Sequence, residues 1–298
     1  MITIKLWGGM CNQMFQYAFG YVLAKKYGDM LVFDVDFYAN QPGHVGKRGV
    51  IGKNYYPNLS MLELCTRPTL VKIFENKYIS HLIRYHSGGM FLLPGVHFMM
   101  ERLHKYYKCI PYKVGTNNYY DGYWQTARYF ADYSDEIRRE FSPNDEVQQK
   151  VTCWRKSILA KNCIAVHIRR GDYMNKINQA TLHEGNVIGD VEYYLRAIHY
   201  MKQHVEYPVF CFFSDDIEWC KETFSKKLPY AVFVENSGKQ AAMLDLFSIA
   251  ECEHGIMSPS TFSWWGNWLR DHRRDSIVIG PKGEYSNEYF MNENWIKM

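Results

Sequence analysis

One stretch of the chain joins an apolar run to a pair of cations: Cys163-Ile164-Ala165-Val166-His167-Ile168-Arg169-Arg170-Gly171-Asp172-Tyr173. Its first four residues are apolar and partly β-branched, which is typical of a buried strand in a parallel sheet. Because a glycine turn follows, we expect Arg169 and Arg170 at the carboxyl end of that strand. Arginine is planar, always charged and able to bind phosphate through two parallel hydrogen bonds. The stretch therefore predicts a strand that ends at a diphosphate-binding site.

Two other interpretations fit the same residues. Arg169 and Arg170 can be a surface pair held by Asp172, and this alternative stays open on these residues alone. Arg170-Gly171-Asp172 also occurs as a tripeptide in adhesion ligands, but those need an exposed loop. The buried strand predicted here places the tripeptide at the base of a cleft instead.

The composition describes a globular chain. Its 298 residues are 47% hydrophobic and 22% charged, and the length predicts two domains of ordinary size. No run approaches the roughly 20 apolar residues that span a bilayer. Residues 1–7 predict a strand and lack the basic start and long apolar centre of a signal peptide, so we expect the chain as given in the cytoplasm. A net charge of +4 without a basic block gives no case for nucleic-acid binding.

The cysteines and aromatic residues add two expectations. The eight cysteines contain no Cys-x-x-Cys pair, which predicts reduced thiols in or near the core and neither zinc ligands nor disulfides. The 24 tyrosines and 8 tryptophans make a carbohydrate ligand plausible, because their rings stack on sugar faces while their polar tips hydrogen-bond.

The first half of the chain opens with a βαβ pattern. We predict a strand over residues 2–7, a turn at Gly8 and Gly9, a helix over 12–27 capped by Asn12, and a strand over 30–33. Gln13 and Gln16 lie three residues apart at the turn end of this helix. Residues 41–120 show no clear pattern, and 89–93 read either as a strand or as a buried loop. Helices are predicted over 126–141 and 145–156, with the domain boundary near them.

The second half alternates strands and helices. Strands are predicted from 163, over 208–213, 231–234, 255–257 and 276–279, and helices over 190–204, 217–224, 240–250 and 261–269. This alternation predicts a parallel doubly wound sheet. Ligands of such sheets bind beyond the carboxyl ends of the strands, where this chain places Arg169, Asp215 and Ser260.

Asp215 and the serines each have two interpretations. Asp215 can cap the next helix, or it can accept the two protons that guanine presents at N1 and N2. The hydroxyls of Ser260, Thr261 and Ser263 can cap a helix, and with its free backbone amides they also form an anion site. Trp264, Trp265 and Trp268 are expected to pack in the core.

Four motifs together resemble the α-1,2-fucosyltransferases of glycosyltransferase family 11. They occur in the family's order and span nearly the whole chain: residues 8–18 (GGMCNQMFQYA), 122–125 (GYWQ) with Tyr129 and Phe130, 167–173 (HIRRGDY) and 260–266 (STFSWWG).

The resemblance implies an α/β fold of the GT-B type, with two Rossmann-like domains facing each other across a cleft. Residues 1–150 would form the acceptor-side domain and residues 151–298 the domain that binds GDP-fucose. The implied reaction transfers L-fucose from GDP-β-L-fucose, with inversion and without a metal or other cofactor, to the 2-hydroxyl of a terminal galactose in a glycan.

The resemblance also assigns roles to residues. Arg169 is expected to contact the diphosphate and Asn12 to face the reacting centre, and both are expected to be catalytic. The donor-binding residues implied are His167, Arg169, Arg170, Asp172, Asp215, Ser260, Thr261, Phe262 and Ser263. The acceptor-binding residues implied are Gln13, Gln16, Trp124 and Gln125. Cys11 and Pro259 depart from the family pattern, which usually has Gly and often has Asn there, and the departures leave acceptor choice and local geometry open.

Several alternatives stay open. Asp34-Val35-Asp36 is a short Asp-x-Asp pattern of the kind that holds Mn²⁺ or Mg²⁺ in other glycosyltransferases, although turn carboxylates after a strand are common. A fucosyltransferase that makes an α-1,6 or protein O-linked product, or a module that binds GDP-sugar and glycan without turnover, would share parts of the pattern. Whether the surface of residues 106–120 makes peripheral contact with a lipid-linked glycan at the membrane also stays open. No carboxylate is singled out as a catalytic base.

Overall fold

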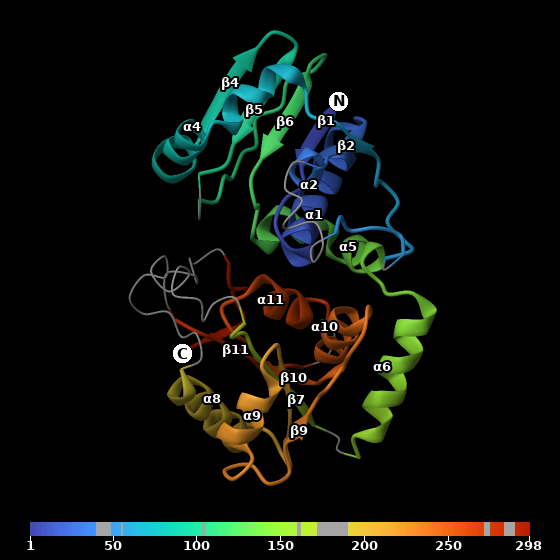
Figure 1. The fold of residues 1–298 in the computed structure, drawn as a ribbon, viewed down its shortest axis with the longest axis vertical. Helices are drawn as coiled ribbons and strands as arrows, with labels where there is room; N and C mark the ends of the chain where they lie inside the picture. Colours follow the sequence, from blue (N-terminus) through green and yellow to red (C-terminus); the bar gives the residue numbers. More distant parts are fainter. Residues whose placement is uncertain are drawn as a thin grey trace. The chain divides into compact units, whose positions relative to one another are not determined.

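The computed structural model describes residues 1–39, 49–54, 56–102, 105–159, 162–171, 190–270, 275–282 and 290–298. They form two compact units, Met1–Ser142 and Pro143–Met298 (Figure 1). The division falls between α5 (Ser134–Glu140) and α6 (Asp145–Ser157), earlier than the expected division after residue 150, so all of α6 belongs to the second unit. Each unit contains a six-stranded sheet with helices, which confirms the expected α/β organisation of the GT-B type.

The first unit is built on a sheet with the strand order β3-β2-β1-β6-β5-β4. Only the β4–β5 pair is antiparallel among the described pairs of this sheet. The strands are β1 (Ile2–Lys5), β2 (Leu31–Asp34), β3 (Leu64–Cys65), β4 (Gly89–Leu93), β5 (Val96–Met100) and β6 (Asn117–Asp121). The order reverses between β1 and β6, which are neighbours in space although they lie at opposite ends of the unit's sequence.

Helix α1 (Met10–Tyr27) covers one face of this sheet. Its aromatic residues make its contacts: Phe19 stacks on Trp124 with ring centres 4.1 Å apart, and Tyr17 stacks on Phe33 at 5.4 Å. Such pairs contribute beyond the area that they bury. The helix is therefore buried along most of its length and does not show the single apolar stripe of a surface helix.

The other face of the first sheet packs against a short helical segment. This segment consists of η1 (Thr69–Glu75), α4 (Lys77–Leu82) and η2 (Ile83–Ser87). Val71 and Ile83 from it form a core with Phe98 and Tyr119 of the sheet. The remaining short elements of the unit are α2 (Asp36–Ala39), η3 (Ala127–Tyr129) and η4 (Ala131–Tyr133).

The second unit contains a parallel sheet with the order β9-β8-β7-β10-β11-β12. This is the 3-2-1-4-5-6 order of dinucleotide-binding folds. The strands are β7 (Cys163–Ile168), β8 (Val209–Ser214), β9 (Val232–Phe233), β10 (His254–Ile256), β11 (Val278–Gly280) and β12 (Ile296–Lys297). The helices besides α6 are α8 (Val191–His204), α9 (Ile217–Phe224), α10 (Ala241–Glu251) and α11 (Thr261–Trp268).

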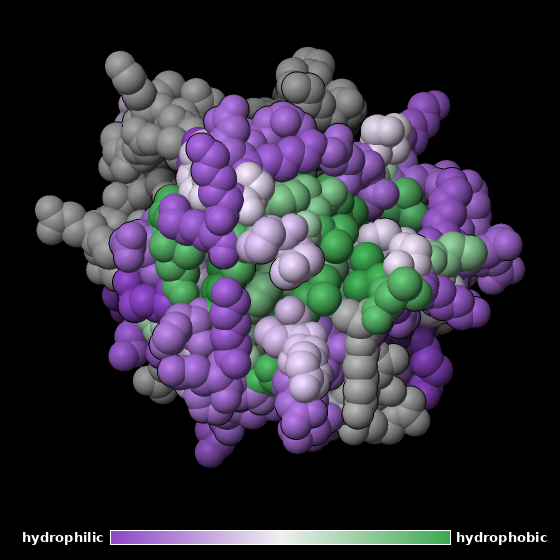
Figure 2. Space-filling model, turned by 90° about the horizontal axis from the view of Figure 1, so that it is seen from below, coloured by the Kyte–Doolittle hydropathy of each residue, from purple (hydrophilic) through white to green (hydrophobic). Residues whose placement is uncertain are grey.

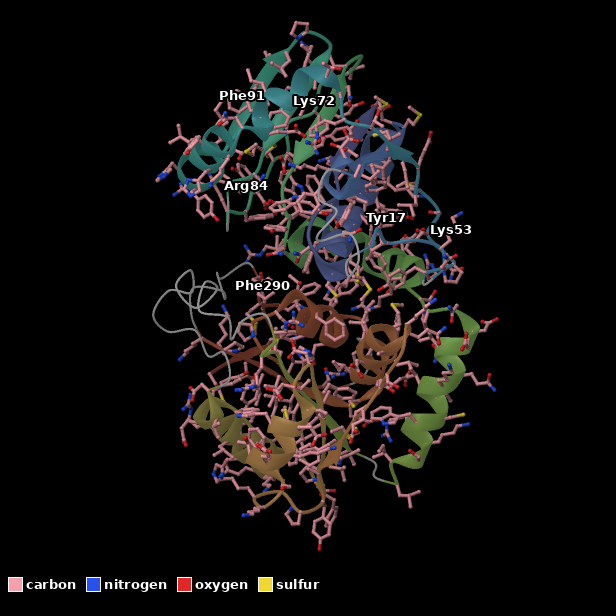
Figure 3. The ribbon with its side chains drawn as sticks, viewed as in Figure 1. Tyr17, Lys53, Lys72, Arg84, Phe91 and Phe290 are labelled. Atoms are coloured by element: carbon pink, nitrogen blue, oxygen red, sulfur yellow. The ribbon has the colours of Figure 1, made fainter. Side chains whose placement is uncertain are left out.

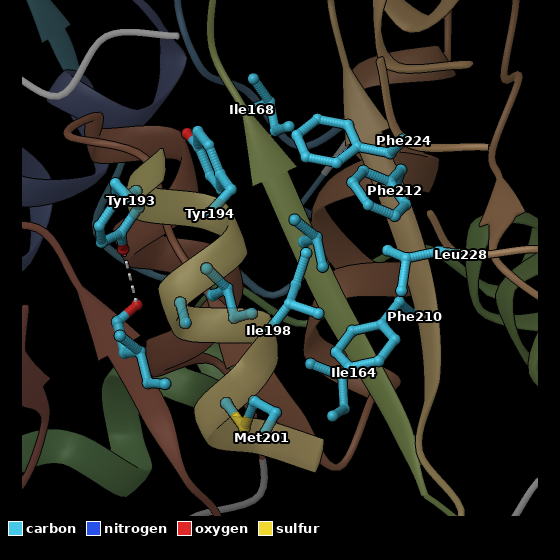
Figure 4. Close-up of a cluster of buried hydrophobic side chains, with 14 of the residues drawn as sticks. Ile164, Ile168, Tyr193, Tyr194, Ile198, Met201, Phe210, Phe212, Phe224 and Leu228 are labelled. Atoms are coloured by element: carbon cyan, nitrogen blue, oxygen red, sulfur yellow. Dashed lines mark hydrogen bonds between the residues drawn. The ribbon is translucent and has the colours of Figure 1, made fainter. Parts of the chain in front are cut away.

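Strand alternation divides the second core into two layers. Ile164, Ile168 and Phe212 point towards α8 and α9 and pack there with Tyr193 (Figure 4). The hydroxyl of Tyr193 donates a hydrogen bond to the Ile279 carbonyl at 3.4 Å. On the opposite face, the buried thiols of Cys163, Cys211 and Cys252 form a cluster: Cys163 Sγ lies 3.2 Å from Cys211 Sγ and 3.0 Å from Cys252 Sγ. All eight cysteines are free, as the sequence predicts, but Cys109 and Cys153 are exposed and do not lie in the core.

Two local predictions are wrong. Asn12 does not cap α1, which begins two residues earlier at Met10 after Gly9. Residues 126–141 do not form one helix but two 3₁₀ turns followed by the short α5. Residues 89–93 form a strand, which resolves the two alternatives left by the sequence.

No described helix combines the length and the apolar composition needed to cross a membrane. Figure 2 shows one face of the molecule, on which hydrophilic residues surround a smaller hydrophobic area. Such a mixture is usual, because apolar atoms contribute more than half of the surface of folded proteins.

Candidate active site

Three neighbouring strands of the second unit carry the predicted donor residues at their carboxyl ends. β7 lies between β8 and β10 and is parallel to both. Arg169 follows β7, Asp215 follows β8, and Ser260 follows β10 after a short turn. The strand order reverses between β7 and β10, and open α/β sheets bind ligands at such a point.

Both arginines of the motif contact the aspartates that follow β8. Arg169 Nη1 lies 2.8 Å from Asp215 Oδ2, and Arg170 Nε donates to Asp216 Oδ2 at 2.9 Å. The guanidinium carbon of Arg170 also lies 3.8 Å from the centre of the Trp219 ring, which is a cation–π distance. The two arginines are therefore held by contacts from β8 and α9. Asp172 lies outside the described residues.

Asp215 and Asp216 have different roles. Asp216 caps α9, because its Oδ1 accepts a hydrogen bond from Trp219 N at 3.4 Å. Asp215 instead accepts from Arg170 N at 2.8 Å. It also lies against Gly171, where a Cβ would come within 2.3 Å of Asp215 Oδ2. The capping interpretation thus applies to Asp216, and glycine at 171 leaves room for the Asp215 carboxylate, which a side chain there would displace.

His167 is buried beside the entry of α11. Its Nδ1 lies 2.9 Å from Ser258 Oγ, and its ring centre lies 5.2 Å from that of Phe262. Burial, with a smaller contribution from the charge of Arg169, lowers the pKa of His167 to about 3. His167 is therefore neutral at pH 7, where it can donate or accept a hydrogen bond but adds no charge to the site.

Ser260 caps α11 and links a group of hydroxyls. Its Oγ accepts from Ser263 N at 3.1 Å and lies 3.3 Å from Ser258 Oγ. Ser263 Oγ in turn accepts from Ser258 N at 3.2 Å. The first amides of a helix have no partner within it, so this end of α11 combines hydroxyls with backbone donors and the positive end of a helix dipole. Such an arrangement is suited to bind an anion.

The charges of this site balance one another. Two guanidinium groups face two carboxylates, and the histidine is neutral. Arg169 and Asp215 are the residues predicted for the diphosphate and for the base, and they contact each other. A bound diphosphate would therefore compete with Asp215 for Arg169, and a guanine would compete with Arg169 for Asp215.

In the first unit, Asn12 contacts a predicted acceptor residue. Gln125 Nε2 donates to Asn12 Oδ1 at 3.0 Å, which joins the first turn of α1 to the loop that follows β6. Trp124 lies in the same loop with a positive φ of 56° and a fully buried ring. Its backbone N–H donates to Glu101. The loop is thus fixed on both sides of Trp124.

Gln13 and Gln16 are buried and bonded to the backbone. Gln13 Nε2 donates to Gly49 O at 3.0 Å, and Gln13 Oε1 accepts from Ile51 N at 2.9 Å. Gln16 joins the turn after β1 to the loop after β6, because it accepts from Trp7 N and donates to Gly122 O, both at 3.1 Å. These contacts position loops, and binding of an acceptor by either side chain stays a prediction.

Asp34 takes part in a buried ion pair. Its Oδ2 accepts from Arg67 Nε at 2.7 Å and from the Tyr119 hydroxyl. Its Oδ1 accepts from Asp36 N at 2.9 Å. Both oxygens of Asp34 therefore have protein partners. Among the described residues, no group of three His, Cys, Asp or Glu side chains is placed to hold a metal ion.

A match to a protein-family model shows to which family the chain belongs. The model of glycosyl transferase family 11 matches residues 99–298, which is more than half of the chain and includes all the predicted donor residues. The chain belongs to glycosyltransferase family 11.

Curated relatives and a solved structure are similar to this chain. An alpha-1,2-colitosyltransferase of Escherichia coli is 28% identical over 100% of this chain and 99% of its own length. Human galactoside alpha-(1,2)-fucosyltransferase 1 is 28% identical over 47% of this chain and 40% of its own length. The crystal structure of NodZ alpha-1,6-fucosyltransferase soaked with GDP-fucose superposes with a TM-score of 0.57 at 13% identity, over 90% of this chain and 92% of that chain. At that identity the likeness concerns the fold alone.

Within this family 11 chain, the structure groups most predicted donor residues at one sheet edge. It also adds three residues that the sequence analysis did not single out: Ser258, Asp216 and Trp219. The first two stand beside predicted residues in the sequence, so widening each motif by one or two positions would have included them. The contact of Trp219 with Arg170 has no such signal, because it depends on where α9 packs.

Proposed function

We propose that the protein transfers L-fucose from GDP-β-L-fucose to the 2-hydroxyl of a terminal galactose in a glycan, with inversion and without a metal. The observation that carries this proposal is the position of Arg169: it lies at the point where the strand order of a dinucleotide-type sheet reverses, within contact of Asp215. The α-1,2 linkage is supported by the names of two relatives, the colitosyltransferase and the human fucosyltransferase.

The donor would be held by groups already in place. Arg169 and the entry of α11 offer charge and hydrogen bonds to the two phosphates, and Asp215 offers a carboxylate that matches the N1 and N2 protons of guanine. His167 is neutral, so it would bind as a hydrogen-bonding group. When the donor binds, phosphate would replace Asp215 as the partner of Arg169, and guanine would replace Arg169 as the partner of Asp215. Neither charged side chain would then lack a partner.

Fucosyl transfer with inversion is a single displacement through an oxocarbenium-like state, in which negative charge grows on the departing GDP. A fixed guanidinium beside the phosphates stabilises this charge in the transition state more than in the ground state, which lowers the barrier. Asn12 is proposed to face the reacting centre from the acceptor side, with Gln125 holding its carboxamide in place.

A colitosyl donor is the second candidate. The whole-length match to an alpha-1,2-colitosyltransferase favours it, because that relative and the fucosyltransferase are named for the same linkage and differ in the sugar named. Incubation with GDP-fucose and with GDP-colitose, each with a β-galactoside acceptor, separates the two through the rate of GDP release. An α-1,6 or protein O-linked product would be recognised from the linkage by NMR, and a module without turnover would bind GDP-fucose but release no GDP when a glycan is added.

Substitution of Arg169 tests the proposal. Arg169→Ala is expected to lower turnover by roughly a hundred- to a thousandfold, since loss of one preorganised donor costs about 2.7–4 kcal/mol. Arg169→Lys should also be poor, because an ammonium group lacks the planar fork. The matched control is Arg196→Ala, which removes an exposed arginine of α8. Near-normal turnover by Arg169→Ala would refute the assignment.

A further inference from the structure

A second group of polar and aromatic side chains lies in the first unit, at the carboxyl ends of β1, β5 and β6. β6 lies between β1 and β5 and is parallel to both, and the strand order reverses between β1 and β6. The position is the counterpart of the donor site in the second unit, since ligands of α/β sheets bind where the order reverses. The group consists of Lys5, Trp7, Arg84, Glu101, Asp121 and Tyr123.

Asp121 holds the two cations of this group. Its carboxylate lies 2.9 Å from Lys5 Nζ and 2.9 Å from Arg84 Nη2. Arg84 also lies against an aromatic pair: its guanidinium carbon is 4.6 Å from the centre of the Trp7 ring, and Trp7 stacks on Tyr123 at 3.9 Å. Figure 3 labels Arg84, which reaches this strand end from η2. Residues distant in sequence thus converge on one edge of the sheet.

Two donors of this group have no partner. Trp7 Nε1 and Arg84 Nη1 are both buried atoms without a hydrogen bond. A buried donor left unsatisfied costs about 1–3 kcal/mol, so native proteins rarely keep one without a reason. Trp124 Nε1 is also unpaired, but its ring is enclosed in the core against Phe19. Trp7 and Arg84, in contrast, belong to residues that are partly exposed.

The ion pairs identify the kind of ligand. Lys5 and Arg84 both pair with the Asp121 carboxylate, so neither cation is free to select a phosphate. What remains is a pair of N–H donors beside aromatic rings, a combination suited to the oxygen atoms of a neutral sugar. The group adjoins the Asn12–Gln125 contact, because Tyr123 and Gln125 belong to the same loop.

We propose that Trp7 and Arg84 form a subsite that binds oxygen atoms of the acceptor glycan through Trp7 Nε1 and Arg84 Nη1. The inference rests on the proposed function, which it deepens by naming two residues that set acceptor affinity.

Trp7→Phe gives the sharpest test, because it removes the N–H and keeps an aromatic ring. We expect the KM for a β-galactoside acceptor to rise roughly tenfold, the effect of one hydrogen bond. The KM for GDP-fucose should not change. The thermal stability should not fall through loss of a hydrogen bond, because the indole N–H has no protein partner. Trp154→Phe, on α6 of the second unit, is the matched control.

Arg84→Lys is the second variant, for the case that Trp7→Phe fails to fold. An ammonium group can still pair with Asp121 but has no second nitrogen to offer, so the KM for the acceptor should again rise while that for the donor stays. An unchanged acceptor KM in both folded variants, or a loss of kcat alone, would overturn the proposal.

Glycan binding without a donor separates this inference from the proposed function. Saturation-transfer NMR with the β-galactoside should show a signal for the wild-type protein that Trp7→Phe weakens. If the wild-type protein shows this binding but no turnover of GDP-fucose, the subsite stands and the proposed reaction fails. If turnover is normal and neither binding nor acceptor KM depends on Trp7, the subsite fails and the reaction stands.

Discussion

Burial shifts the pKa values of two residues of this protein in opposite directions. His167 has a lowered pKa and Glu101 a raised one, because burial disfavours the charged form of each. Glu101 accepts from Tyr123 N at 2.6 Å and from Trp124 N at 3.1 Å, and so holds the loop that carries Gln125. Its protonation state therefore bears on the geometry of the loop that is proposed to bind the acceptor.

The pH dependence of stability should report on Glu101. Burial raises the pKa of this carboxyl to about 7, against the opposing effects of the Trp124 and Tyr123 amides and Arg84, while Asp121 adds to the rise. The folded state then binds the proton more tightly than the unfolded chain, whose pKa is about 4.3. The stability contributed by Glu101 is complete below about pH 4 and is lost as the pH rises towards 7.

Glu101→Gln isolates this contribution. As the pH rises from 5 to 7, the unfolding free energy of the variant should increase by on the order of 2 kcal/mol relative to that of the wild-type protein. Urea unfolding at each pH measures this difference. The comparison with the wild-type protein is needed because two other buried groups also make stability depend on pH. Burial raises the pKa of Asp245 to about 6, so its contribution falls as the pH rises, whereas the lowered pKa of His167 makes stability increase with pH between about 3 and 6.5. Glu218→Gln, on the exposed side of α9, is the control. Parallel pH curves for Glu101→Gln and the wild-type protein would contradict the prediction.

At the scale of elements, the first turn of α11 combines a structural cap with the proposed phosphate site. Ser260 accepts from Ser263 N in the same way that Asn144 accepts from Val147 N at the start of α6. The two caps are alike in their hydrogen bond, but only that of α11 lies at the carboxyl edge beside His167 and Arg169.

Substitution of the two caps should separate stability from activity. Ser260→Ala and Asn144→Ala should each lower the unfolding free energy by about 1 kcal/mol, which is the usual effect of losing a cap. Only Ser260→Ala should also raise the KM for GDP-fucose. Equal kinetic effects of the two variants would show that Ser260 acts through folding alone.

The elements that were predicted well share a strong local signal. α9 runs from Ile217 to Phe224 as expected, and the strands beginning near Cys163 and Val209 are mostly apolar because both of their faces are covered. Residues 126–141 were misjudged because apolar spacing does not reveal where a chain tightens into 3₁₀ turns. β5 and β6 were missed because Tyr, Asn and His occur in them, and these are satisfied by partners distant in sequence, as in the 3.0 Å contact between His97 and Asn118.

At the scale of the whole molecule, each unit has its own sheet and core, and the proposed donor contacts all come from the second unit. Motif order in the sequence was sufficient to assign the family and to collect Arg169, Asp215 and Ser260 at one edge. It could not anticipate the pairing of Arg169 with Asp215 or the convergence on Trp7, because both depend on the three-dimensional placement of loops that carry no repeated pattern.

Binding of the donor nucleotide should stabilise the folded protein. GDP at a hundred times its Kd should add about 2.7 kcal/mol to the unfolding free energy, which a thermal melt detects as a higher Tm. Excess EDTA should leave both this shift and turnover unchanged, because the proposed site uses guanidinium groups and amides. Loss of activity in EDTA that Mn²⁺ restores would instead assign a metal, with Asp34 and Asp36 as the first residues to test. Arg169→Ala should reduce the shift.

The cluster of Cys163, Cys211 and Cys252 makes the second unit easy to follow by chemical labelling. Cys109 and Cys153 are exposed, one in each unit, and can react with a maleimide in the native protein. The clustered thiols are enclosed between the sheet and its helices, so they become reactive only when this layer opens. Adducts that are mapped over time to these three cysteines therefore count opening events of the second unit, without any engineered probe.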